Sequence, residues 1–151
     1  MSESTKRAGE VEPNVAARVR DSFARQGLMA HLGAELADIS SGRVTIRLPY
    51  RNELTQQDGF FHAGASSAIA DSAGGYAGLT VFPVGSSVLT VEYKINLVAP
   101  ARGEYLEAVG SVIRSGRTLT VCQLEVFAVN GNERTLVAAG QQTLFCLPER
   151  S

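Results

Sequence analysis

Several residue types that carry common chemistry are scarce in this chain of 151 residues, which has no tryptophan, two cysteines and two histidines. Cys122 and Cys146 are too few for a disulfide framework, and neither lies in a C-x-x-C pair or near a histidine, so we expect no metal site. Both lie among alternating apolar residues, which favours buried thiols. The chain also has no H-E-x-x-H motif, no G-x-S-x-G turn and no Walker Gly-Lys-Ser/Thr sequence.

The chain also lacks an excess of charge of either sign and a long apolar run. Fourteen Lys and Arg residues against fifteen Asp and Glu give a net charge of −1, which argues against a nucleic-acid partner held by a basic surface. No apolar run approaches the ~20 residues that a membrane span needs. The first residues are polar and form no apolar h-region, so we expect no signal peptide and a cytoplasmic location.

What the chain does have is enough apolar mass for one core, since 44% of its residues are hydrophobic. We expect a polar tail over residues 1–13 and a single domain over residues 14–151. Apolar residues recur every four positions from Asn14 to about Met29. This spacing predicts an amphipathic helix with Asn14 as its N-cap and Gly27 near its end.

Six strands are predicted around a second helix. They are expected over residues 33–39, 43–50, 87–97, 105–114, 118–129 and 134–147. Along residues 87–97, apolar residues at odd positions alternate with polar residues at even positions, so one face of this strand should be buried. The strand over residues 118–129 is apolar on both faces and should lie centrally in the sheet. The order of elements predicts an α+β fold whose last four strands form an antiparallel meander.

The segment from His62 to about Leu79 consists almost entirely of small residues. Four of them are glycines, and each glycine inside a helix costs ~1 kcal/mol relative to alanine. A helix with so many small residues needs a compensating reason, which the close approach of a surrounding sheet would supply. We therefore expect a central helix that is buried on most sides.

Asp71 is the one charged residue between Asp58 and Glu92. An ionised carboxylate in an otherwise apolar helix is costly unless it is paired, hydrogen-bonded or placed at a wet cleft. Such carboxylates mark functional sites, but they also occur in structural ion pairs. Two interpretations therefore stand side by side: Asp71 is catalytic, or it bonds a loop amide or an arginine and only fixes the fold.

The start of the central helix offers a second group of candidates. The amides of Ala63 and Gly64 lie in the first turn, where N–H groups lack intrahelical partners and can stabilise an oxyanion. His62, just before them, is either catalytic or a cap under the helix. Nine residues separate His62 from Asp71, which places them ~13 Å apart along the axis and about half a turn out of phase. If both groups serve one site, an antiparallel copy of the helix must supply one of them.

Two segments resemble a known family. Gly59-Phe60-Phe61-His62-Ala63-Gly64, followed by Ile69-Ala70-Asp71-Ser72-Ala73-Gly74, resembles the G-x-x-H-G-G…L-A-D-x-A pattern of hotdog-fold acyl-CoA thioesterases, with the phenylacetate-pathway (PaaI-type) group the most similar. Residues 90–101 resemble the strand that follows in that family. Order and spacing agree from about Leu32 to Leu147. The resemblance implies a hotdog fold, in which an antiparallel sheet wraps around a long central helix, here with an extra N-terminal helix.

The resemblance also implies an activity and roles for single residues. It implies an acyl-CoA thioesterase without metal or cofactor, since CoA is part of the substrate. Asp71 would be the general base or the nucleophile, and the Ala63 amide would polarise the thioester carbonyl. Gln56, six residues before His62, would place the water or the carbonyl, with Gln57 as the neighbouring alternative.

Further residues are implied as substrate contacts. On the central helix and the next strand these are Gly64 and Thr90, and the acyl pocket would be lined by Phe60, Phe61 and Tyr76, which could equally be core residues. Basic side chains are expected near the CoA phosphates. The candidates are Arg102, Arg114 and Arg117, for which simple solvated charge is an equally good interpretation.

The sequence departs from the family pattern at two positions. Ala63 replaces the first glycine of His-Gly-Gly, which is tolerable if its backbone is helical but not if the position needs a positive φ. Gln56 replaces the commoner asparagine, which is shorter. Neither departure removes the carboxylate of Asp71.

The family further implies a homodimer with sites at its interface, commonly paired into a homotetramer. Two other functions remain as alternatives. One is a non-catalytic module that binds acyl-CoA. The other is a hydratase or dehydratase, which is less favoured because those enzymes usually pair the aspartate with a histidine, whereas the residue five positions after Asp71 is Tyr76.

Overall fold

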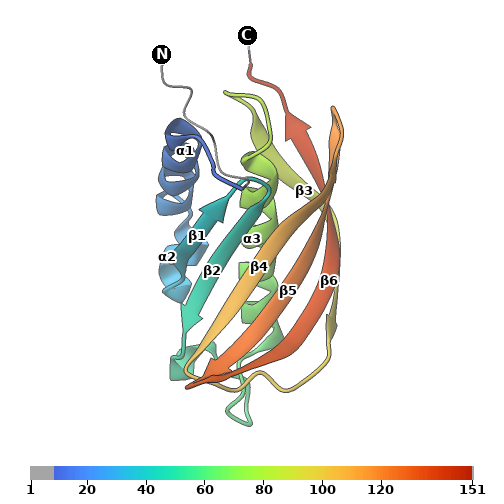
Figure 1. The fold of residues 1–151 in the computed structure, drawn as a ribbon. Coiled ribbons are helices and arrows are strands. Elements are labelled where there is room, and N and C mark those ends of the chain that lie inside the picture. Colours follow the sequence, from blue (N-terminus) through green and yellow to red (C-terminus); the bar gives the residue numbers. More distant parts are fainter. Residues whose placement is uncertain (1–8, 151) are drawn as a thin grey trace.

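The structure, a computed structural model, describes residues 9–150 and consists of a curved sheet wrapped around one long helix (Figure 1). All neighbouring strands are antiparallel, in the order β1-β2-β4-β5-β6-β3. The strands are β1 (Glu35–Ser40), β2 (Arg43–Pro49), β3 (Ser87–Leu97), β4 (Tyr105–Ser115), β5 (Leu119–Asn130) and β6 (Glu133–Leu147). Each of the six predicted strands is present, within two residues of its predicted limits. The doubly apolar β5 has a strand on each side, as predicted.

The predicted meander of the last four strands is wrong for β3. Strands β4, β5 and β6 follow one another through short turns, but β3 pairs with β6 and forms an edge of the sheet. The chain after β3 runs along the lower end of the molecule to reach β4 on the far side of β5 (Figure 1). Because this connection is longer than a hairpin turn and contains Pro100, it does not fold β4 back onto β3.

The central helix α3 (Ala63–Leu79) lies against the concave face of the sheet, and most of its residues are buried. Its glycines permit the close approach that the sequence predicts. A Cβ atom on Gly110 of β4 would lie 2.3 Å from the backbone nitrogen of Gly74, so the sheet and helix backbones touch there. A Cβ on Gly78 would lie 2.5 Å from a methyl group of Leu144 on β6.

The predicted N-terminal helix over residues 14–29 is two helices, α1 (Pro13–Ala24) and α2 (Gly27–Leu32). The helix is interrupted because Gln26 has an extended backbone, with φ −81° and ψ 102°, and Gly27 begins α2 rather than ending α1. Pro13 is the first helical residue, so the structure does not use Asn14 as the N-cap. Most of the predicted tail, residues 1–8, lies outside the described residues.

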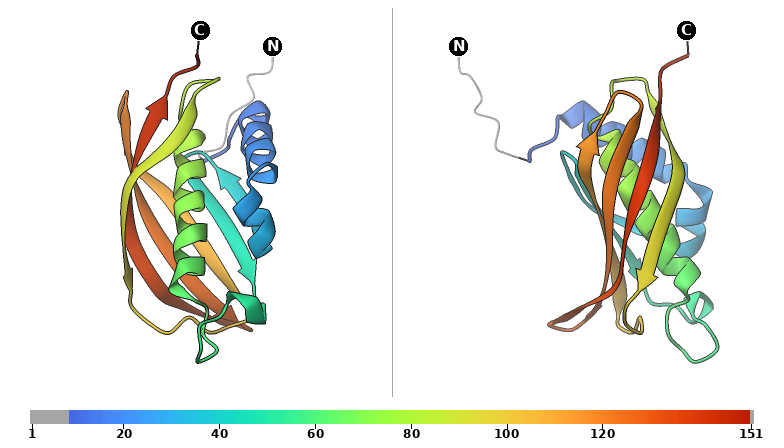
Figure 2. Two further views of the ribbon diagram at one scale, coloured as in Figure 1. Left: turned by 180° about the vertical axis from the view of Figure 1, so that it is seen from behind. Right: turned by 90° about the vertical axis from the view of Figure 1, so that its right-hand side faces the viewer.

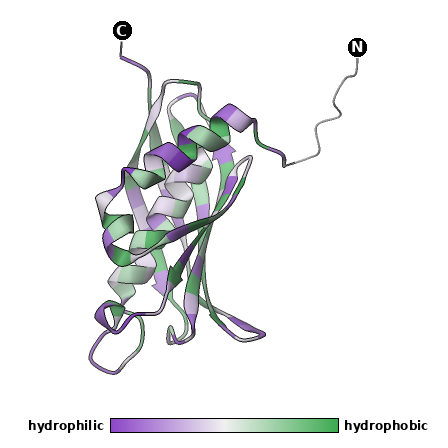
Figure 3. Cartoon of the chain, turned by 90° about the vertical axis from the view of Figure 1, so that its left-hand side faces the viewer, coloured by the Kyte–Doolittle hydropathy of each residue, from purple (hydrophilic) through white to green (hydrophobic). Residues whose placement is uncertain are grey.

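The two N-terminal helices lie on the side of α3 that the sheet leaves open (Figure 2). Hydrophilic and hydrophobic residues are interleaved along them, as expected for helices with one covered face (Figure 3). Gln26 lies at the break between them, and its side chain accepts a hydrogen bond from Ser72 and donates one to the hydroxyl of Tyr76. The hydrogen bonds of Gln26 therefore connect the N-terminal helices to the middle of α3.

The segment between β2 and α3 is held firmly despite its polar sequence. A short 3-10 helix, η1 (Asn52–Leu54), opens it, and the amide of His62 donates to the carbonyl of Leu54. The amide of Phe61 donates to Ala101, in the chain that leaves β3. These bonds fix the backbone just before α3 begins.

Two remaining predictions concern the cysteines and membrane-spanning segments. Cys122 and Cys146 are buried free thiols, as expected, and burial raises the pKa of the Cys122 thiol to about 12. Along residues 9–150, none of the helices has both the length and the apolar content needed to cross a bilayer.

Candidate active site

The first turn of α3 presents one free backbone donor. His62 is the N-cap, with an extended backbone, and its Nδ1 accepts a hydrogen bond of 2.7 Å from the amide of Gly64. The structure thus gives His62 the capping role that the sequence left as an alternative. The Ala63 amide has no acceptor among the described residues, and it carries the positive end of the helix dipole. It is therefore available to a carbonyl oxygen.

The substitution of alanine at position 63 does not strain this turn. Ala63 lies in regular helix, and among residues 9–150 every positive φ belongs to a glycine. The methyl group of Ala63 is therefore compatible with the backbone, and its amide is oriented as in any first helical turn.

A hollow of about 480 Å³ lies beside this amide. Gln56 and Ala63 line it together with Phe60 and Phe61. Most of its remaining wall comes from the end of β3 and the chain after it, and the rest from α3 and β6. The side-chain oxygen of Gln56 accepts hydrogen bonds from the amides of Asp58 and Phe60. Its Nε2 has no acceptor among the described residues, so it can still donate. Gln57 is exposed and bonds to Asp58, which favours Gln56 of the two candidate amides.

Asp71 lies near the middle of α3, away from the hollow beside Ala63. Its Oδ1 accepts two hydrogen bonds of 2.6 Å each, from Thr90 Oγ1 on β3 and from Gln142 Nε2 on β6. Oδ2 has no donor among the described residues. One oxygen of the carboxylate is therefore fixed by the sheet, and the other remains available for chemistry.

An irregularity in β3 brings Thr90 to Asp71. The register of β3 against β6 shifts between Thr90 and Glu92, so Val91 forms a β-bulge. Val88 and Ile95 both pack against the core, although one is even-numbered and the other odd-numbered. The predicted uniform alternation along β3 is thus wrong, because the bulge exchanges the two faces. Without it, Thr90 would share the outer face with Glu92 and Lys94.

Gln142 is a candidate site residue that was not singled out from the sequence. It is 1% exposed, and its Nε2 also donates to the main-chain carbonyl of Asp71 at 3.0 Å. The signal was present in the alternation of β6, where Ala138, Leu144 and Cys146 are buried at even positions and a glutamine stands between them. A polar residue on an apolar strand face needs a partner, and Asp71 is that partner.

The two halves of the site are separate within one chain. Asp71 and Thr90 line a second hollow, of about 260 Å³, which contains neither Gln56 nor Ala63. Tyr76 belongs to this second hollow rather than to the one lined by Phe60 and Phe61. Tyr76 is 4% exposed, and its hydroxyl is hydrogen-bonded to Ser22 and Gln26. The predicted acyl-pocket aromatics are thus divided between two places, and Phe61 and Tyr76 both belong to the core.

His62 and the basic candidates lie in different surroundings again. His62 and Gly64 line a third hollow, on the side of α3 that faces α2. Arg102 stacks on the ring of Phe60, 4.8 Å from its centroid, at the edge of the hollow beside Ala63. Arg114 and Arg117 lie at the turn between β4 and β5, where Arg117 lines a separate depression near Phe145. Of the three arginines, only Arg102 is next to a half-site of its own chain.

Comparisons with known proteins show the family to which this chain belongs. Residues 58–135 match the model of the thioesterase superfamily. A protein of Halobacterium salinarum, named provisionally as an esterase, is 32% identical over 75% of this chain and 78% of its own length. The crystal structure of a thioesterase family protein from Silicibacter pomeroyi is 44% identical, with a TM-score of 0.87 over 89% of this chain and 98% of the other.

A further solved structure, the PaaI protein of E. coli from the phenylacetic acid degradation operon, covers 93% of this chain and 98% of its own with a TM-score of 0.81. At 16% identity this likeness shows the fold alone. It confirms the predicted α+β hotdog architecture, in which the extra N-terminal helical segment consists of α1 and α2. With a family model that matches over half of the sequence, the chain belongs to the thioesterase superfamily, a family of thioester hydrolases.

Proposed function

We propose that this protein hydrolyses an acyl-CoA thioester to the free acid and CoA. The thioester carbonyl would accept a hydrogen bond from the Ala63 amide, which stabilises the oxyanion that forms on that oxygen. Asp71 would either take a proton from the attacking water or attack the carbonyl itself to form an anhydride that water then opens. Gln56 Nε2 is placed to donate to the water or to the carbonyl.

The observation that carries this proposal is the state of the Asp71 carboxylate. Thr90 and Gln142 hold one of its oxygens, while the other has no donor among residues 9–150. A carboxylate with only a structural role would be expected to have both oxygens satisfied by protein groups or exposed freely to solvent. An oriented carboxylate with one unengaged oxygen is what a general base or nucleophile requires.

We further propose that each site is formed by two copies of the chain. One side of β3 pairs with β6, and no strand among the described residues pairs with its other side, which is therefore a free edge. Exposed apolar residues follow β3 and the chain just after it: Leu89, Val91, Tyr93, Leu97 and Val98. A long apolar edge of this kind is a template for pairing with another strand. A second copy of β3 is the simplest partner.

The geometry of that pairing would unite the two half-sites. Thr90, near the start of β3, lies at the hollow of Asp71, whereas Leu97, at its end, lines the hollow of Ala63. In an antiparallel pair related by a two-fold axis, the start of one strand faces the end of the other. Asp71 of one subunit would then approach Ala63 of its partner, and the dimer would contain two equivalent sites.

The assembly and setting that we propose follow from the family. The homodimer is the minimal unit, two dimers associate into a homotetramer, and the protein acts in the cytoplasm on acyl-CoA without a metal or a separate cofactor. Arg102 beside Phe60 is the first candidate to meet the phosphates of CoA. In the dimer, Arg114 and Arg117 of one subunit would lie toward the Ala63 end of the other.

Thiol release from a panel of short, long and aromatic acyl-CoAs tests the activity directly. We expect turnover of at least one member and a fall of at least ~100-fold in Asp71→Ala. Asp21→Ala, which removes an exposed carboxylate on α1, serves as the matched control and should retain the wild-type rate. Binding of acyl-CoA without turnover would support the non-catalytic binding module instead.

A further inference from the structure

The buried side chain of Gln142 takes no part in the proposed bond changes, yet among the described residues it is one of two side chains that bond the Asp71 carboxylate. Its Nε2 lies 2.6 Å from Asp71 Oδ1, 3.0 Å from the Asp71 carbonyl oxygen and 3.3 Å from Thr90 Oγ1. We propose that Gln142 is a positioning residue, which fixes the direction of the Asp71 carboxylate so that Oδ2 faces the substrate. This inference rests on the proposed role of Asp71.

The cost of this arrangement supports a function beyond folding. Gln142 Oε1 is buried and has no hydrogen-bond partner among the described residues. Turning the amide over would not help, because it would place Oε1 within 2.6 Å of the carboxylate oxygen, and two acceptors at that distance repel. The orphaned oxygen is therefore the consequence of aiming the NH₂ group at Asp71. An apolar side chain of the same size would leave no polar atom unsatisfied.

Gly74 of α3 leaves room for the side chain of Gln142. A Cβ atom on Gly74 would lie 1.9 Å from Gln142 Oε1 and 2.6 Å from Leu124 on β5. Gly74 lies one turn after Asp71 on the same helix, so a larger residue there would displace the amide from the carboxylate. Gly74 therefore leaves the space that the Gln142 amide occupies. The contact between the backbones of α3 and β4 does not by itself require a glutamine at position 142.

Replacement of Gln142 by methionine tests the proposal, because methionine has nearly the same shape and no donor. We expect kcat for acyl-CoA hydrolysis to fall by about 10- to 100-fold with KM little changed, since the base is misdirected while the binding surface remains. The melting temperature should change little, because the loss of the hydrogen bond to Asp71 is offset by the removal of the orphaned Oε1. The matched control is Gln141→Met, which alters an exposed glutamine next to it on β6 and should leave the rate unchanged.

A double variant separates positioning from any independent effect. In an Asp71→Ala background, Gln142→Met should cost little further rate, because the carboxylate that it positions is absent. An equal loss in both backgrounds would overturn the proposal, as would a Gln142→Met single variant with wild-type kcat. Either of these results leaves the proposed hydrolysis standing, because wild type and Asp71→Ala would still differ.

If the wild type turns over none of the acyl-CoA panel, the proposed function is refuted. Side-chain amide NMR then tests separately whether the Gln142 amide holds the Asp71 carboxylate. The Gln142 NH₂ protons should exchange with water far more slowly than those of exposed Gln141, and they should lose this protection in Asp71→Ala. Exchange of the Gln142 protons at the rate of Gln141 would show that the amide does not hold the carboxylate, and would overturn the inference.

Discussion

At the scale of the single residue, the two oxygens of the Asp71 carboxylate have different surroundings. Oδ1 accepts from Thr90 and Gln142, and no group in the part of the chain that the structure describes donates to Oδ2. Hydrogen bonds to a charged group contribute more than those between neutral groups, so the loss of one donor should weaken the hold on this side chain measurably. The orientation of Asp71 therefore depends on side chains from two different strands.

Thr90→Val removes one of these donors without changing the shape of the side chain. We expect kcat on the preferred acyl-CoA to fall about tenfold, because one charge-assisted hydrogen bond is lost while Gln142 keeps the other. Steady-state kinetics of the variant measure the effect. Thr135→Val, at an exposed position of β6, is the control, and equal rates for the two variants would contradict the account.

Asp71 and Ala63 could be singled out as candidates from the sequence, but the contact of Gln142 with Asp71 could not. Asp71 stands out because it is the one charge in a long apolar segment, and Ala63 because it opens the helix. Gln142 is separated from Asp71 by 71 positions, and only the fold brings them together. The side of β3 on which Thr90 lies was also hidden, since a bulge has no distinct signature among residues 88–92.

At the scale of elements, the contact between α3 and β4 depends on glycine. A Cβ on Gly110 would lie 2.3 Å from the backbone of Gly74, whereas a Cβ on Gly75 would meet nothing within 4 Å. Gly110→Ala should therefore lower the free energy of unfolding by about 1–3 kcal/mol, the usual cost of overpacking. Gly75→Ala should raise it by up to about 1 kcal/mol, because alanine favours helix. Urea titration compares the two, and similar values would refute the backbone contact.

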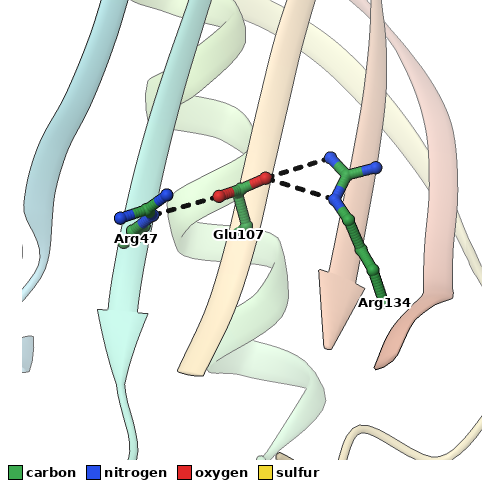
Figure 4. Close-up of polar contacts among 3 residues, drawn as sticks. All are labelled: Arg47, Glu107 and Arg134. Atoms are coloured by element: carbon green, nitrogen blue, oxygen red, sulfur yellow. Dashed lines mark hydrogen bonds and ion pairs between the residues drawn. The ribbon is translucent and has the colours of Figure 1, made fainter. Parts of the chain in front are cut away.

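On the outer face of the sheet, an ionic cluster joins three strands (Figure 4). Glu107 on β4 pairs with Arg47 on β2 and Arg134 on β6, each at 3.0 Å. Arg134 lies over the ring of Phe127 on the intervening strand, 3.4 Å from its centroid. Burial raises the pKa of Glu107, but the hydrogen bonds from Arg47 and then Arg134 outweigh it and lower the pKa below its ordinary value of 4.5.

Because the folded pKa of Glu107 is lowered, its contribution is present above pH 4.5 and is lost as the pH falls through the folded value. Both arginines are about half exposed, so we expect a contribution of only about 1 kcal/mol. The difference in unfolding free energy between wild type and Glu107→Gln should therefore be largest near neutral pH and should shrink in acid and in high salt. A difference that grows on acidification would contradict this assignment.

The limits of the strands could be predicted from alternation and turn residues, but the order of the strands could not. The break between α1 and α2 was also hidden, because glycine at position 27 fits the end of one helix as well as the start of the next. What decides between them is the contact of Gln26 with Tyr76 and Ser72, which exists only after α3 is in place. Long-range contacts thus settle what local patterns leave open.

At the scale of the whole molecule, one chain carries two half-sites at opposite ends of a free strand edge. The Ala63 amide with Gln56 lines one hollow, and Asp71 with Thr90 lines the other. In our account neither half can act alone, and the exposed apolar edge of β3 is where a second copy supplies what is missing. The central claim is therefore that catalysis requires two subunits.

A mixed dimer of two inactive chains tests this claim most directly. One chain carries Asp71→Ala and the other Ala63→Pro, which removes the free amide at a position where proline suits a helix. Each homodimer should be inactive. A dimer purified through a different tag on each chain should regain about half of the wild-type rate on acyl-CoA, because one of its two sites combines the intact Asp71 of one chain with the intact Ala63 of the other. A mixed dimer as inactive as its parents would contradict the account.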